Sequence, residues 1–80
     1  MTLLELPMGT WGVVQSVGGT GNNRIRLLEM GLVPGTYICM VRIAPFGDPV
    51  QVSLRGYALT LRRADAEKIT VCAATDAPQK

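Results

Sequence analysis

The sequence predicts an all-β domain with small α content, a compact and partly open antiparallel barrel of five strands with one short helix between the first two. Three observations support this prediction. Short β-branched or alternating segments follow one another, separated by turns that contain glycine and proline. One amphipathic segment, RLLEMGLVPG at residues 26–35, interrupts them and ends sharply at Met30-Gly31. The chain has 80 residues, enough for one small domain, and 48% of them are apolar, enough for its core.

Strand character is clearest in residues 50–55, where Val50, Val52 and Leu54 alternate with polar side chains and should point inward. Residues 36–44 are apolar on both faces, so the alternation leaves their inward positions open. The loop GGTGNN and the turn PFGDP break the pattern, and RADAEKI should form a single helical turn. The five predicted strands cover residues 11–17, 36–44, 50–55, 57–62 and 69–73.

The inserted helix should cover about residues 23–30, with Asn22 or Asn23 as its N-cap. Ile25 and Leu28 share one face, which we expect to close one end of the barrel. Gly31 fits the left-handed position just past the helix, where Leu32 can fold back on Leu27 in a Schellman motif. Pro34-Gly35 suits a type II turn, because glycine tolerates the positive φ of its second central residue.

A single domain of residues 1–73 is expected, followed by a flexible, polar C-terminal tail of residues 74–80. Leu3, Leu6 and Met8 form a short apolar segment before the first strand. The predicted core consists of Val14, Ile38, Met40, Val52, Leu54, Leu59, Leu61 and Val71.

Composition excludes several classes of protein. The net charge is +2, and no run of like charge exceeds Arg62-Arg63, so a phosphate-backbone footprint is weakly supported. The N-terminal segment resembles no signal peptide, and no apolar run approaches the roughly 18 residues of a membrane span. We therefore expect a soluble, cytoplasmic protein.

Residues that could perform catalysis are not grouped in the sequence. There is no histidine, so neither Ser53 nor either cysteine has an obvious activating base. The segment GGTGNNR lacks the third glycine and the Lys-Ser/Thr pair of phosphate-binding loops. Cys39 and Cys72 alone make a poor metal site, although they could approach each other if the second and fifth strands were neighbours. We expect no enzyme, no cofactor and no bound metal.

The segment RLLEMGLVPGTYICMVRIAPFGDPVQVSLRGYALTLRRADAEKITV, residues 26–71, resembles the FeoA family, small accessory proteins of bacterial ferrous iron uptake. Matching elements include Met30-Gly31-Leu32, Gly47-Asp48-Pro49 and Arg55-Gly56-Tyr57, in the same order. The likeness extends over about residues 3–73. It implies an SH3-like β-barrel with an inserted helix.

The resemblance also implies a function. It predicts a cytoplasmic partner of FeoB, the membrane ferrous iron transporter with an amino-terminal G-protein domain, so this chain would contact the membrane only through that partner. We also allow for weak self-association. Two alternatives stay open: a metal-binding regulatory SH3-like module, and a nucleic-acid-binding barrel. The second would use Arg24, Arg26, Arg42, Arg55, Arg62 and Arg63 for phosphates, with Tyr57 or Trp11 for stacking.

The predicted partner-binding surface centres on Phe46, the only phenylalanine, which lies between two prolines in the turn 45–49. Its ring either caps the mouth of the barrel or faces a partner. Met30 and Leu32 at the helix exit, and Arg55 and Tyr57 on the adjoining hairpin, are expected to be its neighbours. Trp11 has two interpretations as well, packing at the strand edge or anchoring a partner.

Overall fold

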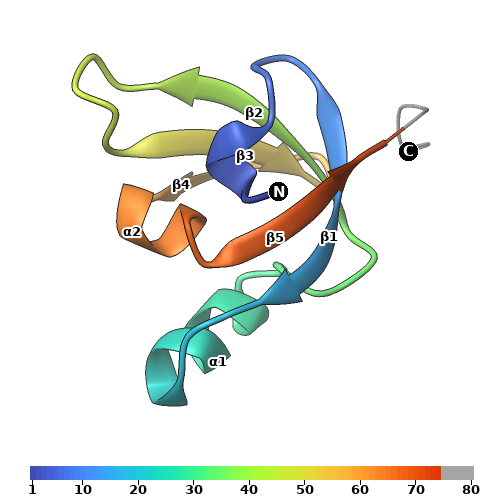
Figure 1. Ribbon diagram of the computed structural model, residues 1–80, viewed down its shortest axis with the longest axis vertical. Helices are drawn as coiled ribbons and strands as arrows, with labels where there is room; N and C mark the ends of the chain where they lie inside the picture. Colours follow the sequence, from blue (N-terminus) through green and yellow to red (C-terminus); the bar gives the residue numbers. More distant parts are fainter. Residues whose placement is uncertain (75–80) are drawn as a thin grey trace.

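The computed structural model describes residues 1–74 as one antiparallel sheet of five strands, in the order β4-β3-β2-β1-β5. Figure 1 shows the sheet curling, so that β1 and β5 cross over β2, β3 and β4, with α1 beyond one end. This is the predicted partly open barrel. The elements are η1 (Leu3–Glu5), β1 (Trp11–Val17), α1 (Gly21–Glu29), β2 (Tyr37–Ile43), β3 (Val50–Leu54), β4 (Tyr57–Leu61), α2 (Arg63–Ala66) and β5 (Ile69–Ala73).

Two irregularities bend the sheet into a barrel. The pairing of β1 with β5 shifts register between Val14 and Ser16, and the pairing of β2 with β3 shifts between Met40 and Arg42. An extra residue in one strand increases its local twist and turns later side chains to a different face. In β2, Ile38, Cys39 and Met40 before the shift are buried, whereas the residues from Val41 onward are exposed.

The core lies between the two halves of the curled sheet. Val50, Val52 and Leu54 of β3 are fully buried, as the alternation predicted. All predicted core residues are buried except Leu59, which is only partly buried because β4 is an edge strand. The sequence prediction omitted several core side chains outside the clearest strands: Leu3, Leu6, Val17, Leu27, Leu32, Ala66 and Ile69.

The segment before β1 packs more closely than predicted. Leu3 and Leu6 of the η1 region are buried, and the Glu5 carboxylate accepts a hydrogen bond from the Thr2 N–H at 2.7 Å. Thr2 bridges Thr70 on the outer side of β5, and Met1 O accepts a hydrogen bond from Val71 N–H at 2.8 Å. This segment therefore covers the edge of β5.

The helix α1 differs from the prediction in its start and its buried face. It begins at Gly21 with Thr20 at the N-cap, and Asn23 instead accepts a hydrogen bond from Arg26 Nη2 at 3.0 Å. Leu27 is fully buried, whereas Ile25 is 50% exposed. Two residues along a helix correspond to a rotation of about 200°, so a helix that buries Leu27 turns Ile25 toward solvent. Leu27, with Leu28 partly buried beside it, packs against the core in place of the predicted Ile25–Leu28 pair.

The end of α1 is as predicted. Gly31 has φ +100°, and its N–H donates to Leu28 O at 3.0 Å. Leu32 N–H donates to Leu27 O at 3.3 Å, which completes a Schellman motif. Gly35 has φ +92°, and Thr36 N–H donates to Val33 O at 3.1 Å, so the type II turn is also confirmed.

The predicted position of one site residue is corrected by this geometry. Leu32 was expected on a partner-binding surface, but it is fully buried. The Schellman stop places this side chain against the helix that it ends, and that contact removes it from the surface.

The predicted tail lies outside the described residues, apart from Ala74. The Ala74 N–H donates to Trp11 O at 3.0 Å, so backbone pairing with β1 continues at that residue.

Replacing Gly31 by alanine should destabilise the fold by about 2–3 kcal/mol, since the left-handed backbone disfavours a side chain. The new Cβ would also lie 2.7 Å from Tyr57 Oη. Urea unfolding of Gly31→Ala, Tyr57→Phe and the double variant separates the two causes. The cost of Gly31→Ala should be about 1 kcal/mol smaller in the Tyr57→Phe background. A cost below about 0.5 kcal/mol in the native background would contradict this account.

Candidate functional site

Three of the predicted partner-binding residues meet where α1 ends and β3 turns into β4. Tyr57 Oη donates a hydrogen bond to Met30 O at 2.6 Å, and Arg55 Nη2 lies 3.4 Å from Thr36 Oγ1. Thr36 Oγ1 in turn donates to Gly31 O at 3.3 Å. Met30, Arg55 and Tyr57 therefore lie on one surface that has both polar and apolar groups, which we call the helix-exit surface.

Arg55 occupies an unusual backbone position. Arg55 and Gly56 are the two central residues between the paired Leu54 and Tyr57, with φ +50° and +84°. This is a type I′ hairpin turn, whose first position normally holds asparagine, aspartate or glycine. An arginine there costs conformational energy, and such strain concentrates at functional positions. The guanidinium is therefore the best candidate on this surface for contact with a partner.

Phe46 lies at the other end of β3 from Arg55. It is 97% exposed, so it does not cap the mouth of the barrel, and that interpretation is wrong. β3 has five residues and so separates the two positions by roughly 17 Å. The expectation that Phe46 is a neighbour of Met30, Arg55 and Tyr57 is therefore wrong as well, because the two surfaces lie at opposite ends of β3.

The β2–β3 loop holds Phe46 in place through backbone and side-chain bonds. Gly47 N–H donates to Ala44 O at 2.7 Å, and Ala44 N–H donates to Pro49 O at 3.1 Å. Asp48 Oδ1 accepts a hydrogen bond from the N–H of Arg63, the first residue of α2, at 3.0 Å. Figure 1 shows this loop projecting away from the barrel. The loop thus presents an apolar ring to solvent on an anchored turn.

Two further exposed apolar side chains, Val41 and Ile43, lie on the last part of β2. We call Val41, Ile43 and Phe46 the hairpin tip. The exposure of Val41 and Ile43 could not be predicted, because residues 36–44 are apolar on both faces and the bulge after Met40 decides which side chains are exposed.

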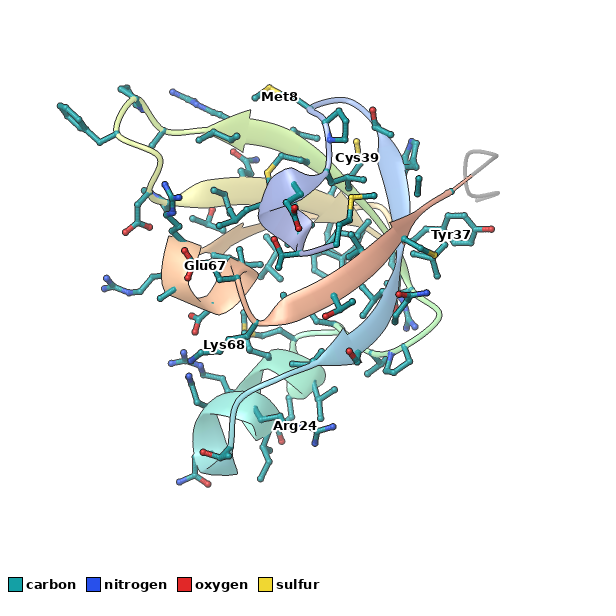
Figure 2. The ribbon with its side chains drawn as sticks, in the orientation of Figure 1. Met8, Arg24, Tyr37, Cys39, Glu67 and Lys68 are labelled. Carbon is teal, nitrogen blue, oxygen red and sulfur yellow. The ribbon has the colours of Figure 1, made fainter. Side chains whose placement is uncertain are left out.

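The two thiols do not form a site together. β1 lies between β2 and β5, where Trp11 pairs with Cys39 and Val13 pairs with Cys72. The condition for their approach, that β2 and β5 are neighbours, is therefore not met. Cys39 is buried, as Figure 2 shows beneath the N-terminal segment, and burial raises the pKa of its thiol against the opposing effect of a backbone hydrogen bond from Gly9. Within residues 1–74, no three side chains of His, Cys, Asp or Glu are grouped to hold a metal ion.

The carboxylate of Asp65 connects the two helices. It is buried in α2 and lies 3.5 Å from Arg26 Nη2 of α1 and 4.0 Å from Lys68 Nζ. Arg63 pairs with Glu67 at 3.4 Å. These pairs engage Arg26 and Arg63, two of the six arginines that a nucleic-acid interface would have used.

Comparisons with known proteins identify the family of this chain. The sequence model of the FeoA domain matches residues 1–72. The chain belongs to the FeoA domain family. The family acts in ferrous iron transport, and its members include SH3-like barrels such as the one described above. No helix within residues 1–74 has the length and apolarity needed to cross a membrane.

One relative joins two proteins in a single chain. The Fe(2+) transport protein A/Fe(2+) transporter FeoB fusion protein of Porphyromonas gingivalis is 46% identical over 71 residues, which are 89% of this chain. Those residues make up 8% of the relative, so this chain spans less than a tenth of its length.

Solved FeoA structures have the same fold. FeoA from Chlorobium tepidum is 44% identical with a TM-score of 0.85, covering 96% of this chain and 74% of that one. FeoA from Stenotrophomonas maltophilia, solved in complex with zinc and described as a prokaryotic SH3 domain protein, is 36% identical with a TM-score of 0.76. That comparison covers 89% of this FeoA domain and 88% of the other chain.

Replacing Arg55 by asparagine should stabilise this FeoA domain by about 0.5–1 kcal/mol, because asparagine suits the first position of a type I′ turn. Urea unfolding measures the change. Arg55→Ala is the matched control, since it removes the guanidinium and keeps an unfavourable side chain at positive φ, and it should give no gain. A destabilised asparagine variant would show that the guanidinium contact with Thr36 outweighs the strain.

Proposed function

We propose that this FeoA domain binds a FeoB-type ferrous iron transporter from the cytoplasm, through the transporter's G-protein region, and modulates transport. The observation that carries the proposal is the relative in which a FeoA domain is covalently joined to FeoB. A covalent link holds two modules at high effective concentration, so that a weak contact between them is occupied. We infer that separate chains make the same contact by association.

The two exposed surfaces support a binding role. The hairpin tip places a fully exposed aromatic ring on an anchored loop, which is the arrangement of an interface anchor. The helix-exit surface places a strained arginine beside a tyrosine. A protein that binds one state of a transporter more tightly than another shifts the balance between states without any chemical step. The proposal therefore assigns no catalysis to this chain.

Binding is tested by calorimetric titration of this FeoA domain into the isolated G-protein region, without nucleotide, with GDP and with a non-hydrolysable GTP analogue. A parallel titration uses the full-length transporter in a lipid nanodisc. The proposal predicts saturable binding in at least one nucleotide state. Absence of binding in every state and to the full-length transporter would refute it.

Phe46→Ala should weaken that binding about 30-fold, which corresponds to about 2 kcal/mol for a truncated interface anchor. Thermal unfolding should be almost unchanged, because a side chain that is 97% exposed contributes little to the core. Ile25→Ala is the matched control, since Ile25 is an exposed apolar residue on α1, and its affinity should equal that of the native chain. Equal affinities for the Phe46→Ala and Ile25→Ala variants would remove Phe46 from the interface.

A further inference from the structure

The guanidinium groups of two arginines have no hydrogen-bond or ion-pair partner within residues 1–74. The side chains of Arg42 and Arg62 are both exposed, and no hydrogen bond or ion pair within these residues holds either guanidinium group. Every other cation of these residues is engaged by a carboxylate, a carbonyl or a hydroxyl: Arg24 by Val17, Arg26 by Asp65 and Asn23, Arg55 by Thr36, Arg63 by Glu67, and Lys68 by Asp65.

These two free guanidinium groups flank the same groove. Arg42 of β2 is paired with Gln51 of β3, and Gln51 is paired with Thr60 of β4, so the three residues form a row across three strands. A hollow beside this row is lined by Arg42, Gln51 and Thr60, and it continues past Pro49 and Thr60 to a second hollow at Arg62. Neighbouring strands lie about 4.8 Å apart, so the groove spans on the order of 10 Å from β2 to β4.

The chemistry of the groove favours carboxylates attached to an extended chain. Guanidinium groups bind carboxylates in a bidentate fashion, and the Gln51 amide and the Thr60 hydroxyl can donate between them. Pro49 and Leu61 supply an apolar floor. One carboxylate, that of Asp48, also lines the groove, but its Oδ1 is occupied by the Arg63 N–H. Two free cations against one engaged anion leave the groove positive.

A peptide fits these features better than a nucleic acid. Sequence-tolerant binding of single strands relies on aromatic platforms for the bases, and the lining of this groove contains no aromatic side chain. Phe46 lies two residues before Asp48 but lines neither hollow, and Tyr57 has its hydroxyl bonded to Met30 O.

We propose that the groove between Arg42 and Arg62 binds an extended acidic segment of a partner protein, with carboxylates paired to the two guanidinium groups. This inference does not rest on the proposed function, because it concerns the chemistry of the groove alone. The groove adjoins the hairpin tip along the sequence, so one partner could contact both.

The experiment is an NMR titration at low ionic strength with a blocked eight-residue peptide of alternating glutamate and threonine. The expected result is a set of saturable shifts at Gln51, Thr60 and the guanidinium groups of Arg42 and Arg62, weakened by added salt. The same peptide with lysine in place of glutamate should cause none. Binding of the glutamate peptide elsewhere, or no binding, would overturn the proposal.

Matched variants test the two arginines. Arg42→Gln/Arg62→Gln should lower the affinity about tenfold or more, because both charge-assisted pairs with the peptide are lost. Arg24→Gln/Lys68→Gln removes the same charge near α1, where Figure 2 shows both side chains, and should change affinity much less. If both double variants lost the same affinity for the peptide, the loss would be explained by net charge alone, and the proposal would be contradicted.

Two further measurements keep the proposal falsifiable. If the glutamine double variant unfolds, Arg42→Lys/Arg62→Lys keeps the charge, and its loss of bidentate pairing should still weaken binding. Inorganic phosphate and a ten-nucleotide oligothymidine are titrated in parallel. Stronger binding of the oligonucleotide at the same residues would assign the groove to nucleic acid, and phosphate binding equal to the peptide's would make it a simple anion site. Either result overturns the proposal.

Discussion

The backbone stop at the end of α1 determines how the chain passes from the helix into the sheet. Two hydrogen bonds, from Gly31 N–H to Leu28 O and from Leu32 N–H to Leu27 O, end the helix and reverse the chain. The reversal buries Leu27 and Leu32 together at one end of the barrel. It needs a residue at φ +100° with no room for a Cβ, because Tyr57 Oη occupies that space. Glycine alone meets both conditions.

The same stop positions the first functional surface. It turns Met30 O toward Tyr57 Oη and brings Thr36 within reach of Arg55. The following type II turn is tied to β1, because Gly35 N–H donates to Val14 O and Val14 N–H donates to Thr36 O. The path from helix to β2 is thus fixed at both ends, and the sheet register follows from it. The candidate binding surfaces lie on the outside of this framework: the turn at Arg55, the hairpin tip and the groove between Arg42 and Arg62.

Local signals in the sequence predicted the parts of the fold that local chemistry determines. The glycine and proline at the helix exit, the strict alternation in residues 50–54 and the polar breaks between strands each have one good structural solution. Positions set by tertiary geometry were not predictable in this way. The face of α1 that meets the core depends on how the helix docks, and both Leu27 and Ile25 were plausible from spacing alone.

The residues of the candidate site divide in the same way, into those that local sequence predicts and those that tertiary geometry positions. Phe46 could be predicted as unusual from its place between two prolines, and its exposure confirms that it is available to a partner. Its distance from Arg55 already follows from the predicted strand at residues 50–55, which places the two turns at opposite ends, so the expectation that they are neighbours conflicted with that strand. Leu32 was misplaced although its Schellman role was predicted, since that role already requires burial. Arg42 and Arg62 were predicted only as members of a larger set of arginines. What separates them from Arg26 and Arg63 is that the latter two form ion pairs, with Asp65 and Glu67. The first of these pairs depends on tertiary contact and the second on a helical turn.

The most direct test of the central claim is native-state hydrogen exchange at the Leu32 amide, measured over a series of low urea concentrations. The account predicts that this amide opens only with global unfolding, so that its free energy of exchange equals that of the Val52 amide in β3. The Ile25 amide, at the middle of the helix on its exposed side, should open at a lower free energy and serves as the internal reference. A Leu32 amide that exchanges by local opening, at a free energy close to that of Ile25, would contradict the claim that the helix stop holds the barrel together.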